Sequence, residues 1–283
     1  MRNILIPTDF SENAMNAVSY ALELFKYEKC NFYIMHAYQD AIYQETIDVT
    51  RDNLDHVTTQ VAQRSAEQLE FILKEINETS PNPRHTYISV SSNNILIDES
   101  DKIVDEKNID LIVMGTKGKS NDKKITFGSQ TLQVLKYVKC PVLAIPENQT
   151  YSPPKHVLFP TNYLIPYKRR ELKLFCDMVA PYRSVVDVVY ISKSTKLSMR
   201  QEDNQRFMKE ALCKNEVNFK TIDSKDVVSA IEAYVENHPI DMLVMVNTRD
   251  SFLESFLYPS RVDQLSLTLN VPFFAMQNIK RDA

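Results

Sequence analysis

Uninterrupted apolar runs and amphipathic stripes alternate along the first half of the chain. Apolar runs bounded by polar residues predict buried strands, whereas apolar residues spaced three and four apart predict helices. The predicted strands cover residues 4–8, 31–37, 86–90, 111–114 and 142–145. The helical stripes lie within residues 14–25, 54–76, 95–104 and 132–135, and Ser11 is placed to cap the first of them.

This alternation of strand and helix implies parallel strands that are joined by right-handed crossovers. The strands lack the polar alternation of a half-exposed sheet, which is typical of strands that are covered on both faces. The predicted fold class is therefore α/β and doubly wound, with helices on both faces of the sheet.

The second half repeats landmarks of the first. Residues 3–9, 109–114 and 140–144 recur as residues 156–162, 240–245 and 271–275. The first offset is 153 and the other two are 131, so the second copy is 22 residues shorter between its first two landmarks. Adjacent prolines favour extended backbone and mark residues 151–155 as a linker. We therefore expect two tandem domains of one fold, residues 1–150 and 151–283.

Glycine is unusually scarce, since the 283 residues include only 3, where average usage predicts roughly 20. All of them, Gly115, Gly118 and Gly128, lie in one short window that follows the strand ending at Met114. The window also holds several lysines although the net charge of the chain is −4. A glycine loop between a strand and a helix start offers N–H groups to an anion, so a phosphate-bearing ligand is expected.

Two well-known phosphate-binding templates fail in this window. Walker A places its first glycine five residues before the second, but Gly115 precedes Gly118 by three. The spacing of a dinucleotide-binding Rossmann loop fails as well. A flexible loop in which the glycines serve only as turn residues is the alternative that the loop alone leaves open.

The complete spacing resembles the nucleotide-binding motif of the ATP-binding branch of the universal stress protein family. The motif is Gly, two residues, Gly, nine residues, then Gly-Ser. Three further segments match family landmarks, namely Pro7-Thr8-Asp9, residues 110–114 and residues 141–145. The resemblance covers most of residues 1–147 and, more weakly, 155–278. It implies two five-stranded parallel sheets of order 3-2-1-4-5, each with a ligand crevice between the first and fourth strands.

The resemblance also implies a site for ATP, with or without Mg²⁺. Asp9, with the backbone near Pro7 and Thr8, would hold the adenosine end, and the backbone of Ala37 would read the adenine edge. Met114 and Gly115 would border the ribose. The N–H groups implied to bind the phosphates belong to Gly118, Gly128, Ser129 and Gln130, with hydroxyls from Ser129 and Thr131. Lys117 is either a ligand or a solvated side chain, and Asp9 alone could be a turn residue.

The second copy departs from this motif. Val246, Arg249 and Pro259 stand opposite the three glycines, Ser260 opposite Ser129, and Asn162 opposite Asp9. Side chains obstruct a close approach to the backbone and proline has no N–H, so we predict that this copy does not bind ATP in the same manner. The apolar segment 252–258 is expected to pack against another surface, with a site for a different ligand as the alternative.

Other classes of protein find little support. The acidic charge gives no sign of nucleic-acid binding, and no stretch approaches the length of a membrane span. The cysteines Cys30, Cys140, Cys176 and Cys213 show no zinc-ligand spacing and fit a reducing, cytoplasmic setting. Nucleophile and metalloprotease motifs are lacking, so at most slow ATP hydrolysis is expected.

The sequence therefore predicts an ATP-binding regulatory protein of the stress-response type. The alternative is an interaction scaffold that keeps a vestigial nucleotide pocket, and an enzyme ranks third. Family members commonly pair through their last strands, so residues 142–145 and 273–276 are expected to pair within the chain. A homodimer and a protein partner are compatible with the sequence, which identifies neither.

Overall fold

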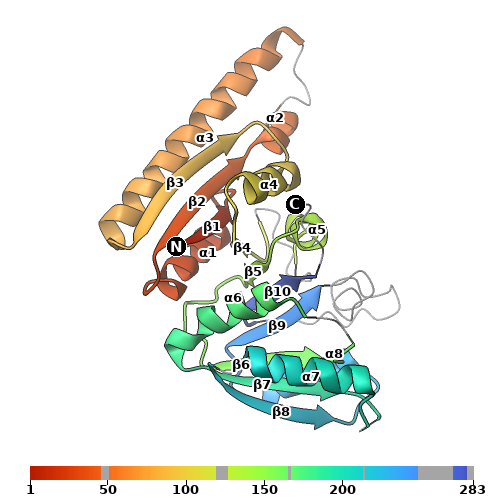
Figure 1. Cartoon of the computed structure of the whole chain (residues 1–283). Coiled ribbons are helices and arrows are strands. Elements are labelled where there is room, and N and C mark those ends of the chain that lie inside the picture. Colours follow the sequence, from red (N-terminus) through yellow and green to blue (C-terminus); the bar gives the residue numbers. More distant parts are fainter. Residues whose placement is uncertain are drawn as a thin grey trace.

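The computed structural model describes residues 1–45, 51–118, 127–164, 167–194, 196–212, 214–247 and 270–278 (Figure 1). The first half runs β1 (Arg2–Pro7), α1 (Glu12–Leu24), β2 (Cys30–Ala37), α2 (Gln39–Glu45), α3 (Arg51–Thr79), β3 (His85–Ser92), α4 (Leu96–Glu106), β4 (Leu111–Gly115), α5 (Ser129–Tyr137) and β5 (Val142–Ile145). The second half runs β6 (His156–Thr161), α6 (Arg169–Val179), η1 (Ala180–Tyr182), β7 (Val185–Ile191), α7 (Met199–Ala211), β8 (Glu216–Ile222), α8 (Val227–Asn237), β9 (Met242–Asn247) and β10 (Phe273–Gln277).

All of these strands belong to one ten-stranded sheet of order β3-β2-β1-β4-β5-β10-β9-β6-β7-β8. Each half has the order 3-2-1-4-5 with parallel neighbours. The halves join where β5 pairs antiparallel with β10, with Leu143 opposite Phe274. The predicted α/β class is confirmed. The expected pairing of residues 142–145 with residues 273–276 is present and joins the two five-stranded sheets into one.

Helices cover both faces of this sheet, as the unbroken apolar strands predicted. Along β1, Ile4 and Ile6 pack into a core shared with α1, α3, α6 and α7. Leu5, between them, faces a second core that is shared with α4, α5 and α8. In Figure 1, α3 and β3 lie at one end of the sheet and β8 lies at the other.

The repeat also appears in hydrogen bonds at the start of each half. The Asp110 carboxylate accepts from the N–H of Asn3 at 3.0 Å, and the Asp241 carboxylate accepts from the N–H of His156 at 2.9 Å. The repeated aspartate therefore fastens the fourth strand of each half to the first. The shorter second copy is explained by its crossover: α2, which we did not predict, and the 29-residue α3 are replaced by the 13-residue α7.

Candidate functional site

The carboxyl ends of β1 and β4 meet where the strand order of the first half changes direction. Crossovers leave these two strands toward opposite faces, which opens a crevice between them in folds of this kind. Asp9 follows β1, and Gly118 follows β4. A Cβ atom on Gly118 would lie 2.7 Å from Asp9 Oδ2. The loop backbone therefore lies directly against the carboxylate, so the structure brings these two predicted site residues together.

The turn after β1 orients Asp9. Asp9 Oδ1 accepts hydrogen bonds from Ser11 Oγ at 2.6 Å and from the Ser11 N–H at 3.1 Å. Ser11 Oγ accepts from the N–H of Ala14 and so caps α1, as predicted. Phe10, between them, adopts a left-handed φ of 63°, and its N–H donates to Thr8 Oγ1. The carboxylate is thereby fixed at the amino end of α1.

Asn13 completes the contact between α1 and the loop. Asn13 Nδ2 donates to the Lys117 carbonyl at 2.7 Å, and the side chain is about nine-tenths buried. A Cβ on Gly115 would lie 2.7 Å from Asn13 Nδ2, so glycine is needed here to admit a protein side chain. Sequence reasoning missed Asn13. The sequence does contain a sign of it: Asn13 is a polar residue among the buried apolar residues of α1, such as Ala14, Ala17 and Val18.

The amino end of α5 lies beside the same loop. The first intrahelical bond runs from the Leu132 N–H to the Gly128 carbonyl, so the N–H groups of Ser129, Gln130 and Thr131 have no acceptor within the helix. The helix dipole makes this end partially positive. Ser129 and Gln130 are exposed, which suits contact with an anion.

Two roles that the resemblance implied are not those seen. The Gly128 N–H, expected to bind phosphate, donates to the Thr116 carbonyl at 2.8 Å and closes the loop. The Thr131 hydroxyl, also expected at the phosphates, is buried and donates to the Gly115 carbonyl at 3.0 Å. Both groups hold the loop and α5 against the end of β4, because a buried hydroxyl or N–H needs a protein acceptor.

The remaining predicted residues surround this point. Pro7 and Met114 are buried at the ends of β1 and β4, and Lys117 is half-buried in the loop. Ala37 ends β2, the strand next to β1, and therefore lies at the same edge of the sheet as Asp9. Gln130 Nε2 donates to Asp40 of α2 at 3.0 Å. Lys119, Ser120, Asp122, Lys123 and Lys124 lie outside the described residues.

The second half builds the same turn, with a small cavity beside it. Thr161 Oγ1 accepts from the Tyr163 N–H, Asn162 Oδ1 accepts from the Leu164 N–H, and Tyr163 has a φ of 55°. Tyr163 is buried and stacks on Tyr190, with ring centroids 5.5 Å apart. Tyr167 is buried beside it and forms a hydrogen bond with Thr161.

A cavity of about 20 Å³ remains at this point, lined by Asn162, Tyr167 and Val246 among others. That volume suits about one water molecule. Gln201 of α7 holds the turn by donating to the Asn162 carbonyl at 2.8 Å. Arg249, Pro259, Ser260 and the segment 252–258 fall outside the described residues.

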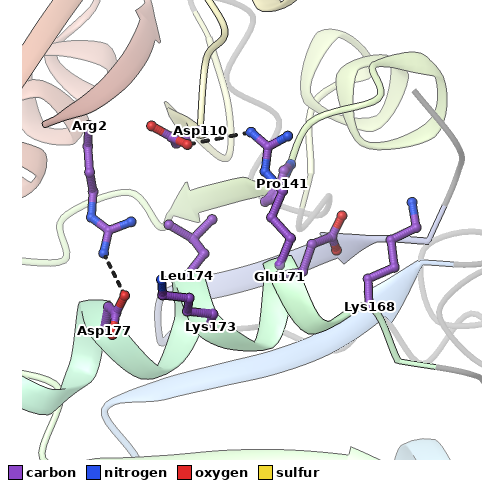
Figure 2. Close-up of a pocket in the computed structure, with 9 residues that line it drawn as sticks. Arg2, Asp110, Pro141, Lys168, Glu171, Lys173, Leu174 and Asp177 are labelled. Atoms are coloured by element: carbon purple, nitrogen blue, oxygen red, sulfur yellow. Dashed lines mark ion pairs between the residues drawn. The ribbon is translucent and has the colours of Figure 1, made fainter. Parts of the chain in front are cut away.

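A larger groove of about 370 Å³ lies between the halves (Figure 2). It is lined by Arg2, Asp110, Pro141, Lys168, Arg170, Glu171, Lys173, Leu174 and Asp177. Arg2 pairs with Asp177 at 3.6 Å, and Arg170 pairs with Asp110 at 3.5 Å. Since Arg2 begins β1 and Asp110 precedes β4, the groove lies at the opposite end of these strands from the candidate crevice. Its cations and anions largely neutralise one another.

The described residues were also considered as membrane spans and as metal sites. No helix in the described ranges is long and apolar enough to cross a membrane. Within the same ranges, no three His, Cys, Asp or Glu side chains are grouped so that they could hold a metal ion. Cys30, Cys140 and Cys176 form no disulfide.

Comparison with known proteins identifies the family. The model of the universal stress protein family matches residues 1–146. The chain belongs to that family. It is 29% identical over 161 residues to universal stress protein MJ0577 of Methanocaldococcus jannaschii, covering 51% of this chain and 94% of that protein. It is 25% identical over 146 residues to universal stress protein MJ0531 of the same organism, covering 51% and 81%.

Among solved structures, a universal stress protein from Archaeoglobus fulgidus superposes along almost the whole chain. The TM-score is 0.66 at 16% identity, with 97% of this chain and 98% of that chain covered. This likeness extends to the second half, which the family model does not match. It shows that the complete ten-stranded arrangement belongs to the fold of a known universal stress protein.

Proposed function

We propose that this universal stress protein binds ATP in the crevice between β1 and β4 and acts as a regulatory protein with little or no catalysis. Residues 1–150 would form the nucleotide-binding domain and residues 151–283 a degenerate domain. The observation that carries the proposal is the approach of Gly118 to the Asp9 carboxylate, 2.7 Å from the position of a Cβ atom, beside the amino end of α5. A carboxylate can accept hydrogen bonds from ribose hydroxyls, and the exposed N–H groups at a helix start can donate hydrogen bonds to phosphates.

We infer the following roles within the motif. Ser129 and Gln130 supply phosphate-binding N–H groups, while Thr131 and the Gly128 N–H hold the loop in place. Mg²⁺, when present, would be carried mainly by the phosphates, since Mg²⁺ often binds proteins through few carboxylates and the nucleotide itself. The described residues offer no group of three His, Cys, Asp or Glu side chains for a metal ion.

Nucleotide binding is tested first on the purified protein. Mass spectrometry of the material released on denaturation should detect ATP or ADP, and added ATP should raise the melting temperature. At a ligand concentration of 100 Kd the stabilisation is about 2.7 kcal/mol. Absence of retained nucleotide together with an unchanged melting temperature would reject the proposal and favour a scaffold with a vestigial pocket.

Two glycine variants test whether a side chain in the loop blocks ATP directly or displaces a residue of the site. Gly128→Ala places a Cβ 3.5 Å from Lys117 Cα, an ordinary contact, so the variant should fold. Loss of ATP affinity in this variant would then come from obstruction of the ligand. Gly118→Val should displace Asp9, whose carboxylate oxygen stands in the way, and abolish binding. Calorimetric titration of both variants with ATP measures the two effects.

A further inference from the structure

The amino ends of α1 and α5 build the candidate crevice, and their carboxyl ends contact the second half. The last carbonyls of a helix have no partner within it and need donors from elsewhere. In this chain the second half supplies donors to both helices. These contacts connect the degenerate half to the proposed nucleotide site.

Tyr182 supplies the donor to α1. Its hydroxyl lies 2.6 Å from the Leu24 carbonyl and 3.1 Å from the Glu23 carbonyl. Tyr182 ends η1, which follows α6 of the second half. Burial raises the pKa of this hydroxyl, so it remains a neutral donor at ordinary pH. The donor thus reaches across from one half to cap a helix of the other.

Asn247 and Gln277 supply the donors to α5. Both side-chain amides donate to the Leu135 carbonyl, at 2.7 Å from Asn247 Nδ2 and 2.8 Å from Gln277 Nε2. Asn247 also donates to Gln277 Oε1 at 2.9 Å, and Gln277 is fully buried. The opposite end of α5 is held as well, since Phe127, next to Gly128, packs on Phe273 of β10 with ring centroids 5.5 Å apart.

We infer that the second half is a positioning element for the nucleotide site: Tyr182, Asn247 and Gln277 fix the helices whose amino ends meet the ligand. The inference rests on the proposed function. Helices α1 and α5 are 13 and 9 residues long, or about 20 and 13 Å at 1.5 Å per residue. Because each helix moves as a rod, a shift at the capped end also moves the N–H groups at the crevice. Hydrogen bonds to phosphate lose strength when such groups are misplaced.

The test compares ATP with adenosine. The double variant Asn247→Leu with Gln277→Met removes both amides that donate to the carboxyl end of α5, while keeping the approximate size of both side chains. Misplaced helix ends should weaken the phosphate contacts, so Kd for ATP should rise about tenfold, a change of about 1.4 kcal/mol. Kd for adenosine should change by less than about twofold, because adenosine lacks the phosphates that use these N–H groups.

Arg170→Gln is the matched control. This substitution removes the ion pair that joins Arg170 of the second half to Asp110 of the first. Asp110 belongs to neither α1 nor α5, so the ion pair does not hold either helix. This variant should bind ATP and adenosine as the wild type does. Should the double variant fail to fold, each single substitution is measured in its place.

The outcomes are distinct. A selective loss of ATP affinity supports the positioning role. Equal Kd values for ATP in the variant and the wild type, with a lowered melting temperature, would overturn it and leave only a stabilising role for these contacts. A parallel loss for ATP and adenosine would also overturn it. A wild type that binds neither compound would reject the proposed function itself, and the inference with it.

Discussion

At the scale of single residues, the three glycines have different roles. None of them adopts a positive φ, so their value lies in the space that a missing side chain leaves. At Gly115 that space holds the Asn13 amide, and at Gly118 it faces Asp9. At Gly128 a Cβ would fit. The sequence predicted the importance of the window, but only the contacts distinguish a glycine needed for folding from one that a ligand requires.

Gly115→Ala is therefore expected to destabilise the fold. The added methyl would overlap Asn13 Nδ2, which is held by the Lys117 carbonyl, and overpacking of this kind costs about 1–3 kcal/mol. Urea unfolding measures the change. Asn13→Ala in the same chain removes the obstructing amide, so the double variant should be more stable than the sum of the single effects predicts. Strict additivity would contradict the proposed overlap.

At the scale of elements, apolar runs predicted the central strands β1, β4 and β5 well because they are largely buried on both faces. Residues 142–145 match β5, and the other predicted strands differ from the observed ones only at their ends. Helix α2 escaped prediction because it is short and buries mainly Ile42. The hydrogen bond from the Thr131 hydroxyl to the Gly115 carbonyl could not be predicted, since sequence alone does not tell a hydroxyl that faces a ligand from one that bonds a nearby carbonyl.

His85, at the start of β3, gives this element a pH-dependent stability. Burial lowers the pKa of the imidazole below its usual 6.5, although a hydrogen bond to the Phe25 carbonyl partly opposes the shift. The unfolded chain therefore binds the proton more readily than the folded one. The contribution to stability is present above pH 6.5 and is lost as the pH falls toward the folded-state pKa.

Urea unfolding at a series of pH values just above and below 6.5 should show this decrease. His85→Gln keeps a polar side chain but cannot titrate, so its stability should change less with pH across the same window. A slope that is the same in both proteins would assign the pH dependence to other groups.

At the scale of the whole molecule, two halves with the same strand order share one sheet but differ where the first and fourth strands end. Asn162 retains the turn of Asp9, and Tyr167 lines the cavity of about 20 Å³ that lies beside it. The sequence predicted that this half lost its motif. It did not predict how small this cavity is, because the residues that line it come from separate segments that only the fold brings together.

The joint between β5 and β10 lies within one chain, so dilution should not open it. Backbone N–H groups of residues 142–145 and 273–277 should show equal protection from hydrogen exchange over about a hundredfold range of protein concentration. Protection that falls on dilution would mean that this pairing forms between chains in solution. Exchange in β3, far from the joint, serves as the internal reference.

The same joint is expected to limit aggregation. Two separate five-stranded sheets would expose four edge strands, whereas the described sheet exposes two, β3 and β8. Unpaired edges can recruit strands from other molecules, and charged residues discourage this. Edge strand β8 carries Glu216 and Lys220, while the apolar β5 and β10 are protected by each other. The pairing of β5 with β10 thus covers two apolar strands, and the edges that remain exposed, β3 and β8, are more polar.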